Sequence, residues 1–463
     1  MSSVTVLFYA FVAFALAITL TDWRRGWLLA MLCGVLQDPA RKLTPGTPVV
    51  MSFSIVIIFA AILFVQHARL LQEARQLARR FPNLAVSGAL LFFFLGLAAL
   101  NGLFTFGLAA WKVPAVSLFI YVVPVTGVLV GFAWVRKEED IDTLFKFYAV
   151  ITSIGLLGTP LEYFRVKWSA LGTVAIAEDY IRHLPGLQIR LLSGFYRAPD
   201  IMGWHAATLT AICMAMGIRA GVLRRAWPWM LGAGWGFFCC LISGRRKAVY
   251  YVAVFAGAFL WRYIRRLGAA QVIALALTAI TLAGVVREVA KDEKSSVYAR
   301  GAVTSQSEIL GRLEGGFFDT IEQFGLMGAG LGSATQGVRH FLGTQNDVGW
   351  QEGGLGKLTV ELGVPGLLAG MLLMFVLFRL LLRVTAVPDV RGSTQITRVT
   401  LFALLVANVL NFMVAAQAYT DAVLTLTSAF FLGALLQTTT LDEKVDEESV
   451  EAVAATAPLP ARA

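Results

Sequence analysis

The chain has 463 residues, of which 57% are apolar and 15% are charged, and its mean hydropathy is +0.71. A soluble protein of this length needs more charged surface, so the composition excludes a water-soluble globular enzyme and indicates a bilayer as the solvent. The net charge of +10 does not predict nucleic-acid binding, because the Lys and Arg residues lie mainly in short stretches between apolar runs. The four cysteines fall inside apolar runs without metal-ligand spacing, so we expect no metal site.

Apolar runs of spanning length recur along the chain and predict an all-α integral membrane protein with about 12 or 13 transmembrane helices. The candidate spans are 4–20, 26–37, 48–66, 84–104, 114–134, 141–159, 201–218, 227–243, 248–263, 268–286, 354–378, 398–418 and 421–437. The second is short and ends near Asp38, which indicates a half-helix or a tilted one. Residues 1–437 thus form one polytopic membrane domain, and the acidic tail 438–463 is expected to be disordered.

The distribution of Lys and Arg predicts the orientation of the spans. Eighteen of these residues lie in loops on one side of the predicted bundle and six in the short loops on the other. The side richer in positive charge is assigned to the cytoplasm. The C-terminus is then cytoplasmic, and two long polar stretches, 160–200 and 287–353, become external loops.

Three adjacent cations follow the eighth span, in the sequence Ser243-Gly244-Arg245-Arg246-Lys247. Their external position opposes the charge bias, which indicates a compensating role. Arg supplies a bidentate fork and Lys a point charge, a combination that suits a diphosphate. The alternative is that these side chains extend toward lipid phosphates at the interface.

A second motif opens the seventh span and runs from Gly194 to His205. Pro199 is typical of a helix start. Arg197 and Asp200 either form a local ion pair at this point or contact substrate. His205 falls inside the span, where we interpret it as a buried bundle residue rather than a catalyst.

The third feature is the stretch that leads into the eleventh span. It contains a Gly-x-Gly-x-Gly run at 328–332, which is not a dinucleotide fingerprint because no strand–turn–helix context surrounds it. Its glycines indicate either backbone that approaches a ligand or a plain turn. Lys357 and Glu361 are four residues apart and can pair on one helix face. Glu352, at the predicted helix mouth, is freer to act as a base.

Together these features resemble the O-antigen ligase and O-antigen polymerase superfamily of bacterial envelope glycosyltransferases, over about 190–370. The matching elements are Gly194-Phe195-Tyr196-Arg197-Ala198-Pro199, Ser243-Gly244-Arg245-Arg246, Arg312, the 328–332 run, and 352–366. Counting back nine residues from Glu361 places Glu352 where the family's ligases carry a histidine. His340 lies twelve residues too early for that place, so a polymerase is favoured over a ligase acting on a lipid A-core acceptor.

The resemblance implies a GT-C-like enzyme of the bacterial inner membrane, with periplasmic catalytic loops and neither metal nor cofactor. It would transfer a glycan from undecaprenyl diphosphate to an acceptor sugar hydroxyl during exopolysaccharide, capsule or O-antigen synthesis. Its partners would be membrane lipids, the lipid-linked oligosaccharide, the acceptor glycan and other assembly or export proteins.

The implied residue roles fall into three groups. Glu352, Arg246 and Arg312 would be catalytic; Arg245, Arg246, Lys247, Arg312 and Arg197 would bind the diphosphate; Lys357, Glu361, His340 and Pro199 would be structural. Fixed cations would stabilise the charge on the leaving diphosphate, and Glu352 would take the proton of the acceptor hydroxyl.

Two alternatives from other classes stay open. One is a transporter, such as a lipid-linked glycan flippase, for which paired inverted repeats and broken helices with charge at the midplane are typical. No internal repeat is visible, and the ionisable residues gather in the predicted external loops. The other is a structural scaffold of an export complex, which would be favoured if the loop cations are dispensable.

Overall fold

The computed structural model describes residues 2–174, 181–184, 187–264, 267–291, 296–298, 307–335, 349, 351–386 and 392–456. Within these ranges the chain is mostly helical, and one small antiparallel sheet forms where β1 (Ile181–Leu184) pairs with β2 (Leu187–Arg190). Ten of the described helices are long and apolar enough to cross a membrane. The prediction of an all-α multi-pass membrane protein is therefore confirmed.

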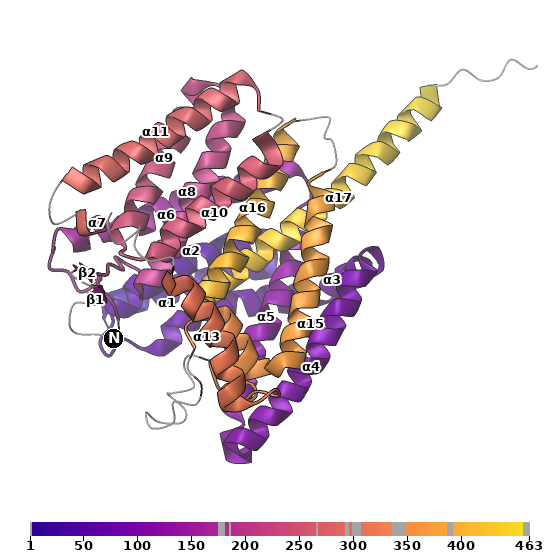
Figure 1. Ribbon diagram of the computed structural model, residues 1–463. Coiled ribbons are helices and arrows are strands. Elements are labelled where there is room, and N and C mark those ends of the chain that lie inside the picture. The colour runs from indigo at the N-terminus through magenta and orange to yellow at the C-terminus, as the bar shows by residue number, and fades with distance from the viewer. Residues whose placement is uncertain are drawn as a thin grey trace, which may run out of the picture.

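The elements follow the predicted spans closely (Figure 1). Before the sheet come α1 (Ser3–Thr21), α2 (Trp23–Lys42), η1 (Val49–Phe53), α3 (Ser54–Arg80), α4 (Pro82–Phe106), η2 (Leu108–Ala110), α5 (Lys112–Trp134), α6 (Glu138–Gly155) and α7 (Gly158–Tyr163). After it come α8 (Pro199–Ala220), α9 (Leu223–Ile242), α10 (Arg246–Tyr263), α11 (Ala269–Lys291), α13 (Ser307–Phe324), α15 (Gly354–Val384), α16 (Gly392–Val414), η4 (Ala416–Thr420) and α17 (Ala422–Thr456).

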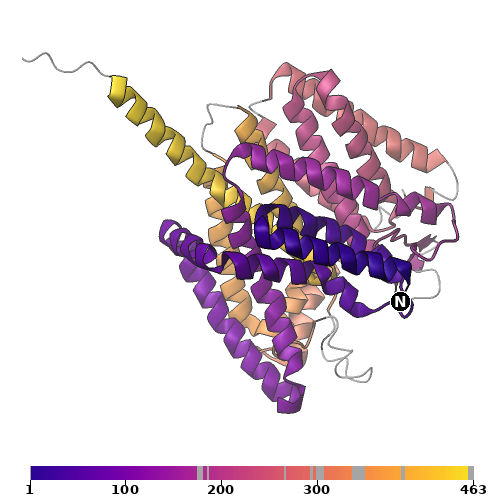
Figure 2. The ribbon, with the colours of Figure 1, turned by 180° about the vertical axis from the view of Figure 1, so that it is seen from behind.

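Each of the thirteen predicted spans contains one of these helices, and α2, α9 and α10 are the three that fall outside the ten apolar ones. The second span is a full helix of 20 residues, which continues through Asp38 and Pro39 to Lys42. Figure 2 shows α2 lying beside α1 on the rear face of the bundle.

The centre of the bundle is α8, whose 18-residue apolar stretch is entirely buried. It packs against α6, α9, α10, α11 and α16. Small side chains allow these helices to approach closely: a Cβ added to Gly236 of α9 would lie 2.8 Å from the main-chain oxygen of Ala206 in α8. Small residues at contacts are typical of helix packing in membranes, where apolar burial between helices supplies little driving force.

The last helix extends beyond its predicted span. It contacts α5 closely, where a Cβ added to Gly433 would lie 2.0 Å from the main-chain oxygen of Val128. It then continues past Gln437 to Thr456 and projects away from the bundle (Figures 1 and 2). The sequence had indicated a disordered tail from 438, whereas the structure has a helix there. Alanine, glutamate and lysine in this stretch have high helix propensity, which explains its helical conformation.

The Gly-x-Gly-x-Gly run forms a loop that inserts between α4, α5 and α15. The main-chain N–H of Leu331 donates to the oxygen of Ala98 in α4 (2.9 Å), and the N–H of Ala329 donates to that of Val360 in α15 (2.8 Å). Next to the loop, α15 is interrupted at Gly363, which has a φ of 66°. The stretch 287–353 thus includes the end of α11, α13 and this inserted segment.

Glycine is required in the inserted loop by close backbone approach. Gly330 has a φ of 86°, and an added Cβ would lie 2.2 Å from the nitrogen of Gly102. The group that this backbone approaches is the protein's own α4, and approach to a ligand stays a prediction.

Substitution of Gly330 by alanine is expected to destabilise the protein by about 3 kcal/mol, since a positive φ and a backbone clash act together. Gly325 is the matched control, because its φ is 71° and nothing lies within 4 Å of an added Cβ. Gly325→Ala should cost only about 1 kcal/mol. Thermal unfolding of the purified variants in detergent measures the difference, and equal losses would show that the clash is relieved by movement of the loop.

Candidate functional site

The predicted motifs gather at one end of the bundle, which we call the hairpin end. It is the end where α8, α10, α15 and α17 begin and where α2, α9 and α16 finish, beside β1 and β2. Hydrogen bonds tie these helix ends together: the main-chain N–H of Leu192 donates to Ser243 (3.4 Å), and that of Ala416 donates to Glu352 (3.0 Å).

The segment that precedes α8 is held by two buried charged side chains. Glu162 accepts hydrogen bonds from the main-chain N–H groups of Ser193 (3.0 Å) and Gly194 (2.6 Å). Lys42 donates to the carbonyl oxygens of Gly194 (2.9 Å) and Tyr196 (2.6 Å). The turn lies outside the helices, so its main-chain N–H and C=O groups need other partners, and these two charged side chains supply them. Their hydrogen bonds fix the path of the chain into α8.

Arg197 pairs with a distant helix rather than with its neighbour Asp200. Its guanidinium lies 2.6 Å from the carboxylate of Asp421, the residue before α17, and its main-chain N–H donates to Asp38 of α2 (2.9 Å). Burial lowers the pKa of Arg197, but Asp421 and Asp38 raise it, and the net result is a raised pKa. These contacts join α2, α8 and α17. A diphosphate-binding role for Arg197 stays a prediction.

Asp200 instead binds the cations at the start of α10. Its carboxylate lies 2.9 Å from the guanidinium of Arg245 and 3.9 Å from the ammonium of Lys247. All three side chains are 16 to 18% exposed, while Arg246 is buried at 8%. Three adjacent cations thus stand beside Asp200 at the start of α10, and grouped cations are a common feature of anion-binding sites.

A small pocket of about 10 Å³, room for about one water molecule, lies beside this ion pair. Its walls come from α8, α10, α16 and η4 and consist of Asp200, Trp204, Arg245, Lys247, Ala248, Tyr251, Asn411, Ala415 and Ala418. Arg245 and Lys247, which follow the eighth predicted span, therefore line a defined recess.

The backbone of Glu352 lies next to the same pocket. Its carbonyl oxygen accepts the hydrogen bond from Ala416, and the neighbouring Ala415 lines the pocket together with Arg245. Glu352 directly precedes Gly353, the N-cap of α15. The start of α10 and the start of α15 are more than a hundred residues apart in the sequence. In the structure both lie beside Ala415 and Ala416, the short stretch that follows α16.

Two predicted site residues, Arg312 and His340, lie partly or wholly outside the part of the chain that the structure describes. Arg312 falls in α13, which packs against α15 so closely that a Cβ on Gly316 would lie 3.4 Å from the nitrogen of Gly356. The side chain of Arg312 and the whole of His340 lie outside the described residues. Pro199 occupies the first turn of α8, as its motif predicts.

A polar network below the pocket was not found from the sequence. Asn408 of α16 accepts from the indole N–H of Trp204 (2.8 Å) and donates to the hydroxyl of Tyr251 (2.9 Å), and Tyr419 donates to its main-chain oxygen (2.8 Å). A lone asparagine in an apolar run carries no spacing signal, so only the contact between α8, α10 and α16 reveals it. The network fixes the walls that carry Arg245.

His205 has the structural environment that the sequence favoured. It is buried in α8, its Nδ1 lies 2.9 Å from the hydroxyl of Tyr148, and its ring stacks on that of Tyr196. It thus packs among aromatic side chains beneath the clamped turn before α8.

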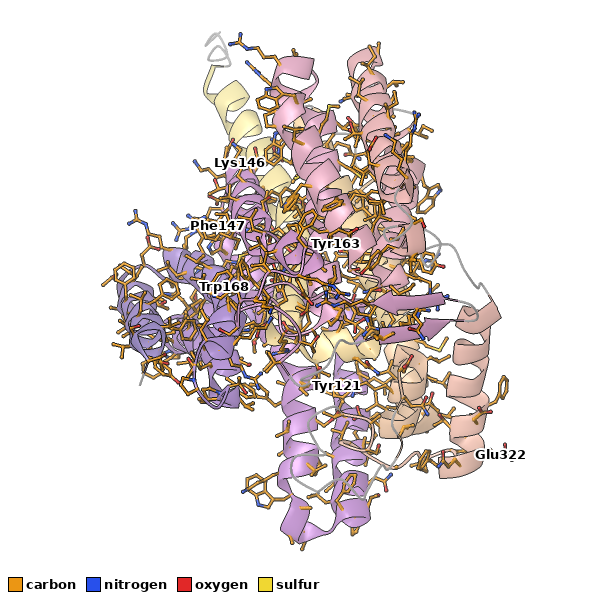
Figure 3. The ribbon with its side chains drawn as sticks, turned by 90° about the vertical axis from the view of Figure 1, so that its left-hand side faces the viewer. Tyr121, Lys146, Phe147, Tyr163, Trp168 and Glu322 are labelled. Carbon is orange, nitrogen blue, oxygen red and sulfur yellow. The ribbon has the colours of Figure 1, made fainter. Side chains whose placement is uncertain are left out.

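Lys357 and Glu361 form a buried ion pair on the first half of α15, with 2.9 Å between the charged atoms and exposures of 6% and 0%. Glu361 also accepts hydrogen bonds from the hydroxyls of Thr335 (2.5 Å) and Tyr121 (2.7 Å). The predicted pairing exists, and it fastens the inserted loop and α5 to α15. Figure 3 shows Tyr121 below the level of β1 and β2.

The chain was compared with protein-family models and with curated proteins. No protein-family model matches the chain, and no curated protein matches it either.

Proposed function

We propose that the protein is a GT-C-like glycosyltransferase of the bacterial inner membrane, with 12 or 13 transmembrane helices and the hairpin end facing the periplasm. It lengthens a cell-surface polysaccharide by transferring a glycan from undecaprenyl diphosphate to an acceptor sugar hydroxyl. The observation that supports this proposal is the meeting of Arg245, Lys247 and Asp200 around one recess, with the backbone of Glu352 beside it.

Glycosyl transfer from a diphosphate needs cations that stabilise the leaving group and a base that accepts the proton of the acceptor, and candidates for both roles lie near this recess. The bond between the anomeric carbon and the diphosphate oxygen breaks, and the acceptor oxygen forms a new bond to that carbon, with inversion. Arg245 and Arg246 stabilise the negative charge that the departing diphosphate gains. Glu352 accepts the proton of the acceptor hydroxyl. Arg312, on α13, is a further candidate for the diphosphate.

Two related activities compete with polymerisation. A ligase would use a lipid A-core acceptor and the same leaving group. A lipid-linked glycan transporter is favoured by one specific observation: α15 is broken at Gly363 beside a buried ion pair, which is typical of transporter helices.

Reconstitution separates these activities. The purified protein is placed in liposomes with lipid-linked oligosaccharide, and glycan length and bilayer crossing are measured. The proposal expects lengthening without added metal or nucleotide sugar. Lengthening that requires a lipid A-core acceptor would favour the ligase, crossing without lengthening would favour the transporter, and neither would favour a scaffold.

Arg246→Lys is expected to reduce lengthening about tenfold or more, because an ammonium cannot reproduce the bidentate geometry of a guanidinium on a diphosphate. Arg136→Lys, at an exposed position at the opposite end of the bundle, should leave the rate unchanged. Normal activity of Arg246→Lys would reduce Arg246 to a point charge, and normal activity of alanine variants at both Arg245 and Arg246 would contradict the proposed site.

A further inference from the structure

A large groove lies between α9 and α11, at the hairpin end of both helices. It has a volume of about 630 Å³, within the range of about 300–1,000 Å³ found for small-molecule sites. Its lining is almost wholly apolar, with the aromatic rings of Tyr163, Phe164, Trp235 and Phe238 on α7 and α9. Figure 3 shows Tyr163 above the level of the hairpin, on the other side from Tyr121, so this groove is separate from the network on α15.

The floor of the groove includes two glycines, Gly234 of α9 and Gly284 of α11. Gly234 lets the helices approach, since an added Cβ would lie 3.1 Å from the side chain of Thr281. Gly284 meets nothing within 4 Å and is open to the groove. Because α11 is apolar enough to cross a membrane, this space lies where lipid chains are the surrounding solvent, and its natural occupant is a hydrocarbon chain.

The groove lies close along the chain to the cationic corner. Ile242, the last residue of α9, lines the groove, and Arg245 follows three residues later on the wall of the small pocket. Phe164, which also lines the groove, is followed by Arg165 and Lys167, both exposed. A carboxylate also lines the groove, Glu288, but its oxygen lies 2.5 Å from the ammonium of Lys291. An apolar groove whose lining residues are followed closely in the chain by several cations fits a lipid whose head carries more than one negative charge.

We infer that this groove binds the polyisoprenyl chain of the lipid diphosphate substrate, so that its head reaches the cations at the start of α10. The inference rests on the proposed function for the identity of the lipid. A single-phosphate phospholipid matches the apolar groove equally well but presents fewer negative charges than a diphosphate to the three adjacent cations at the start of α10.

The test is photolabelling. The full-length protein in nanodiscs receives a polyprenyl diphosphate that carries a diazirine on its chain, and labelled peptides are mapped by mass spectrometry. Labels are expected on α9 and α11 around Trp235 and Gly284. Gly284→Leu fills the open space and should lower labelling of these peptides about tenfold. Gly257→Leu is the matched control, because Gly257 of α10 is exposed and also has nothing within 4 Å of an added Cβ.

Each outcome decides the matter. Labels elsewhere, or equal labelling of the Gly284→Leu and Gly257→Leu variants, overturn the inference. Equal labelling of the groove by a diazirine phospholipid, undiminished by excess unlabelled polyprenyl diphosphate, assigns the groove to bulk lipid and overturns it too. Photolabelling needs no acceptor and no turnover, so groove labelling without glycan lengthening would remove the proposed function alone, and lengthening with labels elsewhere would remove the groove alone.

Discussion

Glu352→Gln is expected to lower glycan lengthening by about 10²–10⁴-fold, the usual contribution of a general base. The amide keeps the size and hydrogen-bonding capacity of the side chain but cannot accept a proton from the acceptor hydroxyl. The main-chain hydrogen bond from Ala416 to Glu352 does not involve the side chain, so the corner of α15 and η4 should keep its geometry. The measurement is the initial rate of lengthening in liposomes, with the amount of protein in the membrane determined in parallel.

Glu322→Gln provides the control for a lost carboxylate. Glu322 is exposed on α13 (Figure 3), remote from the recess, and its substitution should leave the rate unchanged. A Glu352→Gln protein that lengthens glycan at the normal rate would remove Glu352 as the base. A pH–rate profile gives a second criterion, because loss of the base should abolish the acidic limb of the profile.

The second large effect concerns stability. Glu361→Leu is expected to destabilise the protein by about 3–5 kcal/mol, because it leaves the buried charge of Lys357 without its partner. It also removes the acceptor for the hydroxyls of Tyr121 and Thr335. Thermal unfolding in detergent should show a clear fall in the midpoint.

A double variant makes this prediction sharper. Lys357→Met combined with Glu361→Leu replaces both charges by apolar side chains of similar volume, and such replacements are often neutral or stabilising. The double variant should therefore be more stable than Glu361→Leu alone. If the two have the same stability, the cost of the single substitution does not come from an unpaired lysine but from the lost hydroxyl contacts.

Helix positions were largely predictable from the sequence because the membrane imposes a length and an apolar composition on every span. The exceptions are informative. The span near Asp38 was expected to be short because it contains charges and a proline. The structure buries Asp38 at 2% and places it beside Arg197 and Lys42, so the helix continues. Hydropathy reports only the residue itself and not the partner that compensates its charge.

The candidate site was predicted in its parts but not in its pairings. For Arg197 and Asp200 the sequence leaves open a local ion pair or contact with substrate, whereas in the structure Asp200 binds Arg245 and Arg197 binds Asp421. Local spacing favours the near partner, whereas the packing of α8 against α10 and α17 selects the distant one. Lys357 and Glu361 were paired correctly because they lie one helical turn apart.

The inserted glycine loop has a consequence for biogenesis. Residues 325–335 contact α4 and α5, which are synthesised about two hundred residues earlier. During translation the surfaces of these two helices that contact the loop stay unpacked until the last third of the chain has been synthesised. A nascent chain therefore passes through a long period with incomplete packing, and membrane quality-control proteases should remove variants that delay this late closure.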